Sequence, residues 1–271
     1  VAGFWMFCFH IASTDKPFLE PAMFKDRNFA TGLVFIFVIG IILLASLALL
    51  PPMLAKIFGY PTITTGVVMG PRGVGTMISM LLVGRLVRTI DSRILVSIGL
   101  LLTSVSLWMM TGFTPQMTMS PIIWSGVVQG LGLGLVFVPL STVAFSTIAP
   151  EFRADATSLF SLVRNIGSSI GISVVSALLT RNLQVNHTEL SVFISPYNPV
   201  AVQAVPTAIA GNPTALSQVD GLVNIQALMI SYLDDFKLMM IITLMALPLV
   251  FMLRKPAGPA ASGAAVVVHA D

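Results

Sequence analysis

Two arginines lie inside long apolar stretches of the sequence, where a charge needs a structural or chemical reason. Arg72 lies near the middle of the stretch 61–84, and Arg164 lies within the stretch 156–180. A charged side chain in a membrane interior is costly, so such residues face protein or a water-filled cavity. Arg72 is about 18 Å from either end of its stretch, too far for its side chain to reach bulk water. A cavity-lining charge and a clamp on backbone carbonyls beside Pro71 are therefore the two roles open to it.

Small polar residues accompany Arg164 along the same stretch. Ser158, Ser161, Asn165 and Ser168 are spaced by three, four and three positions, which places them on one face of a helix. Such a face turns toward the bundle interior, either for hydrogen bonds between helices or to line a pore. Arg164 itself is about 12 Å from the nearer helix end and is able to reach that interface. With Gln129 in another stretch, the predicted transport-cavity residues are Arg72, Gln129, Arg164, Asn165, Ser161 and Ser168.

Two adjacent carboxylates, Asp234 and Asp235, are the acidic candidates. They lie about 27 Å from the cytoplasmic end of the last helix, near the opposite interface, where a solvated pair is expected. A role in proton coupling is the alternative. The chain has no Ser-His-Asp or Cys-His set and no cluster at metal-ligand spacing. We therefore expect no catalytic residue, no metal site, no cofactor and no enzyme.

Six apolar stretches must position these residues, and each is about as long as the roughly 20 residues that cross a hydrocarbon core. A membrane helix satisfies its own backbone groups, so the pattern predicts an all-α membrane bundle. The chain is 56% hydrophobic and only 9% charged, with a mean hydropathy of +0.94, which excludes an ordinary soluble domain. The net charge of +3 is too small to indicate a nucleic-acid partner. The stretches cover residues 29–50, 61–84, 94–113, 121–148, 156–180 and 236–253.

Basic residues in the connections predict the orientation. If the spans alternate, nine Lys and Arg residues fall on one side and three on the other, and the richer side is cytoplasmic. The carboxyl terminus is then cytoplasmic. We predict the end of a preceding transmembrane helix and a cytoplasmic linker at 1–28, and a six-helix domain at 29–253. A long extracytoplasmic loop at 181–220, with a helix resuming near Gly221, and a disordered cytoplasmic tail at 254–271 complete the organisation.

Glycines recur in several of the predicted helices. Gly66 and Gly70, like Gly167 and Gly171, have the spacing of small residues that lets membrane helices approach closely. Tight static packing and a bundle whose helices bend and slide are both compatible with this pattern.

Several segments together resemble one transporter family. MFKDRNF at 23–29, GPRGVGTMIS at 70–79, QGLGLGLVFVP at 129–139, SLFSLVRNIGSSIG at 158–171 and YLDDF at 232–236 are similar to the fourteen-helix drug:proton antiporter branch of the major facilitator superfamily, the EmrB/QacA type. The resemblance implies a carboxyl-terminal six-helix domain, preceded at 1–12 by the end of an extra helix. It also implies that the chain is the carboxyl-terminal part of a longer protein.

The segment 84–93 resembles the short basic cytoplasmic loop of that superfamily. Gly84, Arg85, Asp91 and Arg93 are its candidate residues. The segment departs from the family pattern at two positions, because Arg88 replaces an Asp and Asp91 replaces a Gly. The charge relay attributed to this loop is therefore not expected here in its usual form.

The resemblance implies proton-coupled efflux of amphipathic drugs or other small molecules by alternating access, across a bacterial inner membrane. The expected partners are the lipid bilayer, the substrate, protons and the amino-terminal half of the same transporter. A periplasmic adaptor and an outer-membrane channel are further expected partners, whereas nucleic acid is not. The alternative is a non-transporting membrane sensor or assembly module that uses the same helices as an interaction surface. A membrane enzyme ranks last, because no reactive group is evident.

Overall fold

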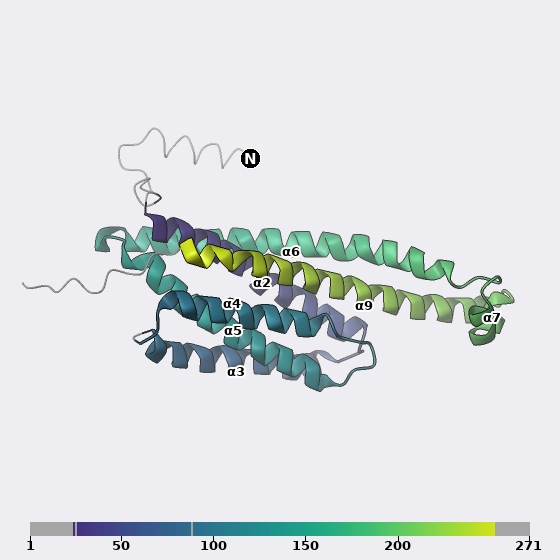
Figure 1. Cartoon of the computed structure of the whole chain (residues 1–271). Helices are drawn as coiled ribbons and strands as arrows, with labels where there is room; N and C mark the ends of the chain where they lie inside the picture. The colour runs from purple at the N-terminus through teal and green to yellow at the C-terminus, as the bar shows by residue number, and fades with distance from the viewer. Residues whose placement is uncertain (1–23, 25, 88, 253–271) are drawn as a thin grey trace, which may run out of the picture.

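The protein is a bundle of long helices in the computed structural model, which describes residues 24, 26–87 and 89–252. No strand occurs in this part of the chain. The predicted helix end at 1–12, Arg88 and the predicted tail at 254–271 lie outside the described residues. The helices, labelled as in Figure 1, are α2 (Arg27–Lys56), α3 (Thr62–Leu86), α4 (Ser92–Met110), α5 (Met119–Ser146), α6 (Arg153–Val192), α7 (Pro199–Ala204), α8 (Pro206–Ile209) and α9 (Pro213–Ala246), with 3-10 turns at Pro150–Phe152 and Pro248–Met252.

Five of the described helices, α2 to α6, are long and apolar enough to cross a membrane. This agrees with the first five predicted spans and with the all-α membrane fold. The sixth prediction, a span at 236–253, was wrong in its bounds. The helix that contains its first half is α9, which begins at Pro213 and ends at Ala246, where a 3-10 turn follows. Three charged residues, Asp234, Asp235 and Lys237, interrupt the apolar part of α9.

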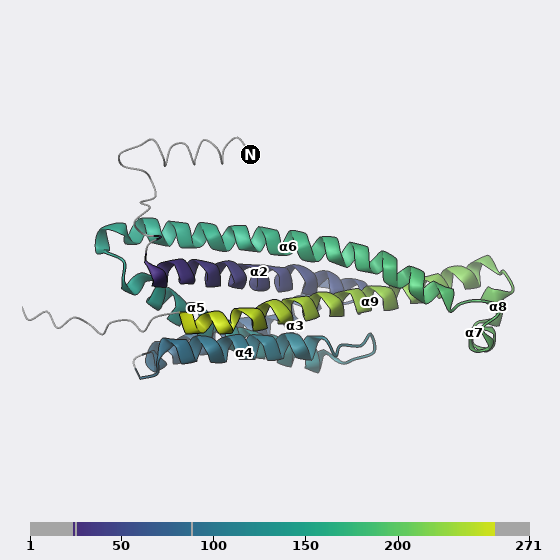
Figure 2. The ribbon, with the colours of Figure 1, turned by 45° about the horizontal axis from the view of Figure 1, so that its top comes forward.

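The predicted extracytoplasmic loop at 181–220 is mostly helical, which corrects the sequence interpretation. The 40-residue α6 continues to Val192, and the 34-residue α9 begins at Pro213, with the short helices α7 and α8 between them. Figures 1 and 2 show both helices running past the ends of α3, α4 and α5, with α7 and α8 at the tip. The prolines of this region misled the prediction: Pro199, Pro206 and Pro213 occupy first-turn positions, where a helix tolerates proline.

Local signals explain where the long helices begin. The Asp26 carboxylate accepts hydrogen bonds from the Asn28 and Phe29 amides at 2.8 and 3.0 Å, and so caps α2. Asn212 caps α9 in the same way, and Gly211 before it has a φ of 87°, a conformation that favours glycine. These caps fix the start of each helix independently of its packing.

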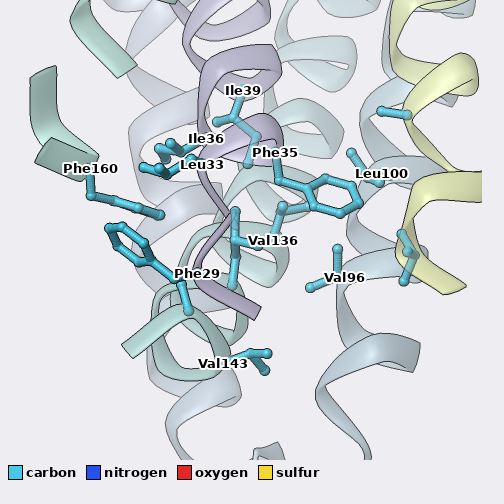
Figure 3. Packing of buried hydrophobic residues seen from close by; sticks show 14 of the residues in the cluster. Phe29, Leu33, Phe35, Ile36, Ile39, Val96, Leu100, Val136, Val143 and Phe160 are labelled. Carbon is cyan, nitrogen blue, oxygen red and sulfur yellow. The ribbon is translucent and has the colours of Figure 1, made fainter. Parts of the chain in front are cut away.

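The α2 helix lies at the centre of the hydrophobic core. Figure 3 shows Phe29, Leu33, Phe35 and Ile36 of α2 among side chains from α4, α5 and α6. A second buried cluster lies farther along α2 and adds residues of α4 and α9. Because α2 contributes to both clusters, it connects the pair α4–α5 with the pair α6–α9.

Glycines bring helix backbones together at several crossings, among them those of α2 with α6, of α3 with α5 and, through Gly99 and Gly132, of α4 with α5. A side chain added at Gly167 would overlap the Phe37 carbonyl, and one at Gly171 would meet Ile41 at 2.8 Å, so the predicted close approach at this pair is confirmed for α2 and α6. At the second crossing, a side chain added at Gly130 of α5 would overlap the Arg72 carbonyl of α3. Gly66 and Gly70 differ, since nothing among the described residues lies within 4 Å of a Cβ added there.

We expect Gly130→Ala to destabilise the chain by about 1–3 kcal/mol, because the backbones of α3 and α5 must separate to admit the methyl group. Gly66→Ala is the matched control in α3 and should be neutral or stabilising by up to about 1 kcal/mol, through helix propensity alone. Thermal unfolding of the detergent-solubilised chain measures both variants. Equal stability of the two variants would show that the α3–α5 crossing is looser than described.

Candidate functional site

A cavity of about 770 Å³ opens between α2, α3, α5 and α6. Its wall consists mainly of aliphatic, aromatic and methionine side chains. Two arginines, Arg72 and Arg164, are the charged residues among the described lining residues. No Asp or Glu is among the described residues that line it. A large apolar pocket with few convergent polar groups is the usual form of a small-molecule site. The apolar wall includes Leu43, Leu47, Met69, Met77, Met80, Leu81 and Phe137.

Arg72 is held by a small hydrogen-bond cluster at the edge of this cavity. Its side chain is only 7% exposed, and Nη2 donates to Ser46 Oγ of α2 at 3.0 Å. The same hydroxyl accepts a longer bond, 3.4 Å, from Gln129 Nε2 of α5, while its own hydrogen is directed to the Ile42 carbonyl at 2.8 Å. The described bond of the guanidinium thus goes to a side chain of another helix, not to a backbone carbonyl beside Pro71.

The cluster is incompletely satisfied. Arg72 Nη1 and Gln129 Oε1 are buried and have no hydrogen-bond partner among the described residues. A buried charged donor without an acceptor is expensive, so this arrangement favours any additional acceptor that reaches Nη1.

The glycines of α5 make room for Arg72. A Cβ added at Gly126 would lie 3.5 Å from the Arg72 Cβ, and one at Gly130 would overlap the Arg72 backbone. Gln129, on the same helix, is fully buried and meets Ser46 from the other side. The segment Gly126–Gly130 therefore provides both the space and one polar neighbour of the arginine.

The six predicted cavity residues lie at four different places in the bundle. Arg72 and Arg164 line the cavity, whereas Gln129 lies behind it in the Ser46 cluster. Ser168 is buried and donates to the carbonyls of Gly40 and Arg164, at 3.1 and 2.8 Å, at the crossing of α2 and α6.

The remaining two predicted residues, Ser161 and Asn165, do not line the cavity. Asn165 is exposed on α6, as is Ser158, the first member of the predicted polar face. That face therefore does not turn as a whole toward the interior of the described bundle. The reason is that, of these four polar residues, only Ser168 lies at the close crossing of α2 and α6.

The loop residues between α3 and α4 form no ion pair in the described part of the chain. Gly84 and Arg85 are exposed at the end of α3. Asp91 caps α4 by accepting from the Arg93 amide at 3.1 Å, and Arg93 Nε is buried without a described partner. The acidic residue that replaces the family glycine thus has a local structural role as a helix cap.

The predicted solvated carboxylate pair is wrong for one of its members. Asp235 is 1% exposed, whereas Asp234 is partly exposed. The prediction failed because it used depth alone. Depth along the helix does not say which side of α9 is buried in the bundle, and Asp235 lies on a buried side, next to Phe236.

Ser46 is the residue of this candidate site that the sequence interpretation missed. It is a lone serine in an otherwise apolar part of the first stretch. Serines in membrane helices commonly bond to their own backbone, as Ser46 also does, so the residue type alone carries little information. Its partnership with Arg72 arises from packing of residues 26 positions apart.

Comparison with known proteins gives consistent matches. The family profile described as Major Facilitator Superfamily matches residues 9–172. Over 264 residues the chain is 29% identical to the Multidrug export protein EmrB of Escherichia coli (strain K12), covering 94% of this chain and 51% of that protein. It is 31% identical over 188 residues to EmrB of Haemophilus influenzae, covering 69% of this chain and 37% of the relative. The Fatty acid resistance protein FarB of Neisseria gonorrhoeae is 31% identical over 182 residues, or 67% of this chain and 36% of the relative. The chain spans about half the length of the E. coli relative. Its matches cover less than half the length of the other two relatives.

We expect Ser46→Ala to destabilise the chain by about 1–3 kcal/mol, because it leaves Arg72 Nη2 and Gln129 Nε2 without their described acceptor. Ser158→Ala is the matched control: its exposed hydroxyl bonds to a carbonyl of its own helix, and its removal should change stability by less than about 0.5 kcal/mol. Unfolding in detergent measures both. An unchanged stability of Ser46→Ala would contradict the role of this hydroxyl as the anchor of Arg72.

Proposed function

We propose that this chain, which belongs to the major facilitator superfamily, supplies one helical half of a multidrug exporter. The observation that carries the proposal is the apolar cavity with two arginines, Arg72 and Arg164, inside a membrane bundle. The names of the relatives, which include multidrug export and resistance proteins, support it. A sensor or assembly module would need an interaction surface, but it would not need a charged cavity within the helices.

Alternating access is the mechanism that we propose for the assembled exporter. In such transporters two halves rock against each other around a site near the midplane. In this chain α3 packs mainly on α5, and its opposite face carries exposed Ile63, Val67 and Leu81 beside Gly66 and Gly70. Open glycines allow another helix to approach closely. We assign this face of α3, together with the cavity beside it, to the contact with the other half.

The substrate that best fits this half is an amphipathic molecule with a negative or hydrogen-bond-accepting end. The apolar wall accommodates its hydrophobic part, and Arg72 and Arg164 are donors without a carboxylate among the lining residues. Arg72 Nη1, which has no described partner, would gain an acceptor when such a group binds. One relative is named a fatty acid resistance protein, and a fatty acid is an amphipathic carboxylate of this class.

Export against a gradient needs an energy source, and we propose proton re-entry across a bacterial inner membrane. The orientation that we propose places the loop between α3 and α4 in the cytoplasm. The tip of α6 and α9 then projects on the extracytoplasmic side, where the expected periplasmic adaptor would meet it. The adaptor, the outer-membrane channel and the other half of the transporter remain part of the proposal.

The binding and transport properties of the chain test this function together. In nanodiscs, a fluorescent amphipathic carboxylate should bind more tightly than the amine with the same apolar tail. Arg72→Ala should weaken carboxylate binding about tenfold or more, which corresponds to the roughly 1.5–3 kcal/mol of a charge-assisted hydrogen bond. Arg85→Ala, an exposed arginine outside the cavity, is the control and should bind normally. Expressed alone in an efflux-deficient host, the chain should confer no resistance, because half of the site is missing.

Two results would contradict the proposal at different points. Equal affinity for the carboxylate and the amine, unaffected by Arg72→Ala, would refute the substrate class. Full resistance from residues 1–271 alone would refute the half-transporter arrangement.

The orientation has its own test by single-cysteine labelling of intact cells. With Cys8 replaced by serine, we expect Gln116→Cys to react with an impermeant thiol reagent and Thr89→Cys to react only after the membrane is opened. Both positions are exposed, and they lie at opposite ends of α4. Labelling of Thr89→Cys but not of Gln116→Cys in intact cells would reverse the proposed orientation.

A further inference from the structure

Asp235 is a deeply buried acidic residue that does not line the proposed cavity. Its side chain is 1% exposed, and neither carboxylate oxygen has a hydrogen-bond partner among the described residues. On α9 it lies between Tyr232, Phe236 and Met239, all of which belong to the second apolar cluster. The ring of Phe236 meets Phe113, just beyond the end of α4, edge-on with centroids 6.3 Å apart. The carboxyl group is therefore enclosed by protein at the level where α4 ends.

No cation among the described residues lies within ion-pair distance of Asp235. Within the described residues the one ion pair joins His187 and Asp220, far up the hairpin of α6 and α9. The helices packed on α9 carry Arg27 and Lys56 at the two ends of α2, Arg93 at the start of α4, and Arg153, Asp155, Arg164, Arg181 and Glu189 on α6. None of these is within ion-pair distance of Asp235. On α9 itself Asp234 adds like charge, and Lys237 is exposed. An ionised carboxylate that is buried without a partner is strongly disfavoured, so the neutral acid is the form that fits this site.

We infer that Asp235 is a proton-binding site of this half, loaded in the described conformation and emptied when α9 shifts and water reaches the carboxyl group. Loading joins one proton from water to a carboxylate oxygen, and unloading returns that proton to water with no other bond changed. The inference deepens the proposed function and rests on it for the coupling to transport. The protonation of Asp235 itself does not depend on the identity of the substrate.

The surroundings provide a direction in which the site can open. One turn from Asp235, Ser231 accepts a hydrogen bond from Asn186 Nδ2 of α6 at 3.1 Å, in an otherwise apolar part of the α6–α9 contact. This polar contact lies on the side of Asp235 that leads to the projecting part of α6 and α9. The neighbouring Asp234 is partly exposed, so the two carboxylates differ in access although they are adjacent in sequence.

Infrared spectroscopy of the purified 271-residue chain in lipid tests the site. At neutral pH the wild type should show the carbonyl stretch of a protonated carboxylic acid, a band that an ionised carboxylate lacks. Asp235→Asn, which preserves the size of the side chain, should remove the band, and the matched control Asp234→Asn should retain it. Labelling the wild type with carbon-13 aspartate should shift the band, which identifies it as aspartate without any substitution. The absence of a protonated-aspartate band, or its loss in Asp234→Asn but not in Asp235→Asn, would overturn the inference.

Coupling is measured separately with the fluorescent amphipathic carboxylate. Adding it to the wild type should weaken the band and release protons into a weakly buffered medium, and Asp235→Asn should bind the compound without releasing them. Equal proton release from wild type and Asp235→Asn would refute the coupling. If the compound fails to bind at all while the band is present, the proposed substrate class fails and the proton site stands.

Discussion

Close contact between helix backbones is the constraint on which the rest of this bundle depends. Lipid provides no hydrophobic force to press apolar helices together, so packing and hydrogen bonds between them must supply the stability. Glycines allow that packing at several crossings, among them those of α2 with α6 and of α3 with α5. Ser168 adds a hydrogen bond to the Gly40 carbonyl at the first crossing, and Ser79 adds one to the Leu131 carbonyl at the second.

The position of Arg72 follows from the second crossing. Because α5 approaches α3 closely at Gly130 and leaves room beside Arg72 at Gly126, the arginine is buried at this crossing, and its Nη2 reaches Ser46 of α2. The Arg72 side chain thus connects α3 to α2, two helices that otherwise make little contact. An apolar cavity lies beside its guanidinium group. A bundle in which these two helices packed fully would have neither the cavity nor the charge at its edge.

The two buried ionisable groups illustrate different solutions to the same cost. Arg72 cannot lose its charge, so the protein provides the Ser46 hydroxyl and an adjacent cavity. Asp235 can become neutral by binding a proton, so it is compatible with an apolar enclosure in which no described residue forms an ion pair with it. The chain therefore combines a fixed charge at the edge of its cavity, Arg72, with a buried carboxyl group, Asp235, for which we propose reversible proton binding.

Much of the fold and part of the site could be predicted from sequence. The apolar stretches identified five helices and the membrane, because a helix in lipid requires a certain length of apolar residues and little else. The burial of Arg72 beside a cavity was predictable, since a charge at that depth must face protein or water. The extension of α6 and α9 was not recognised, because polar helices and polar loops have similar composition and their prolines occupied permitted helix starts. The partner Ser46, the exposed position of Asn165 and the burial of Asp235 were decided by tertiary structure alone. Each depends on how far one helix is rotated against another, and contacts between distant parts of the chain set that rotation.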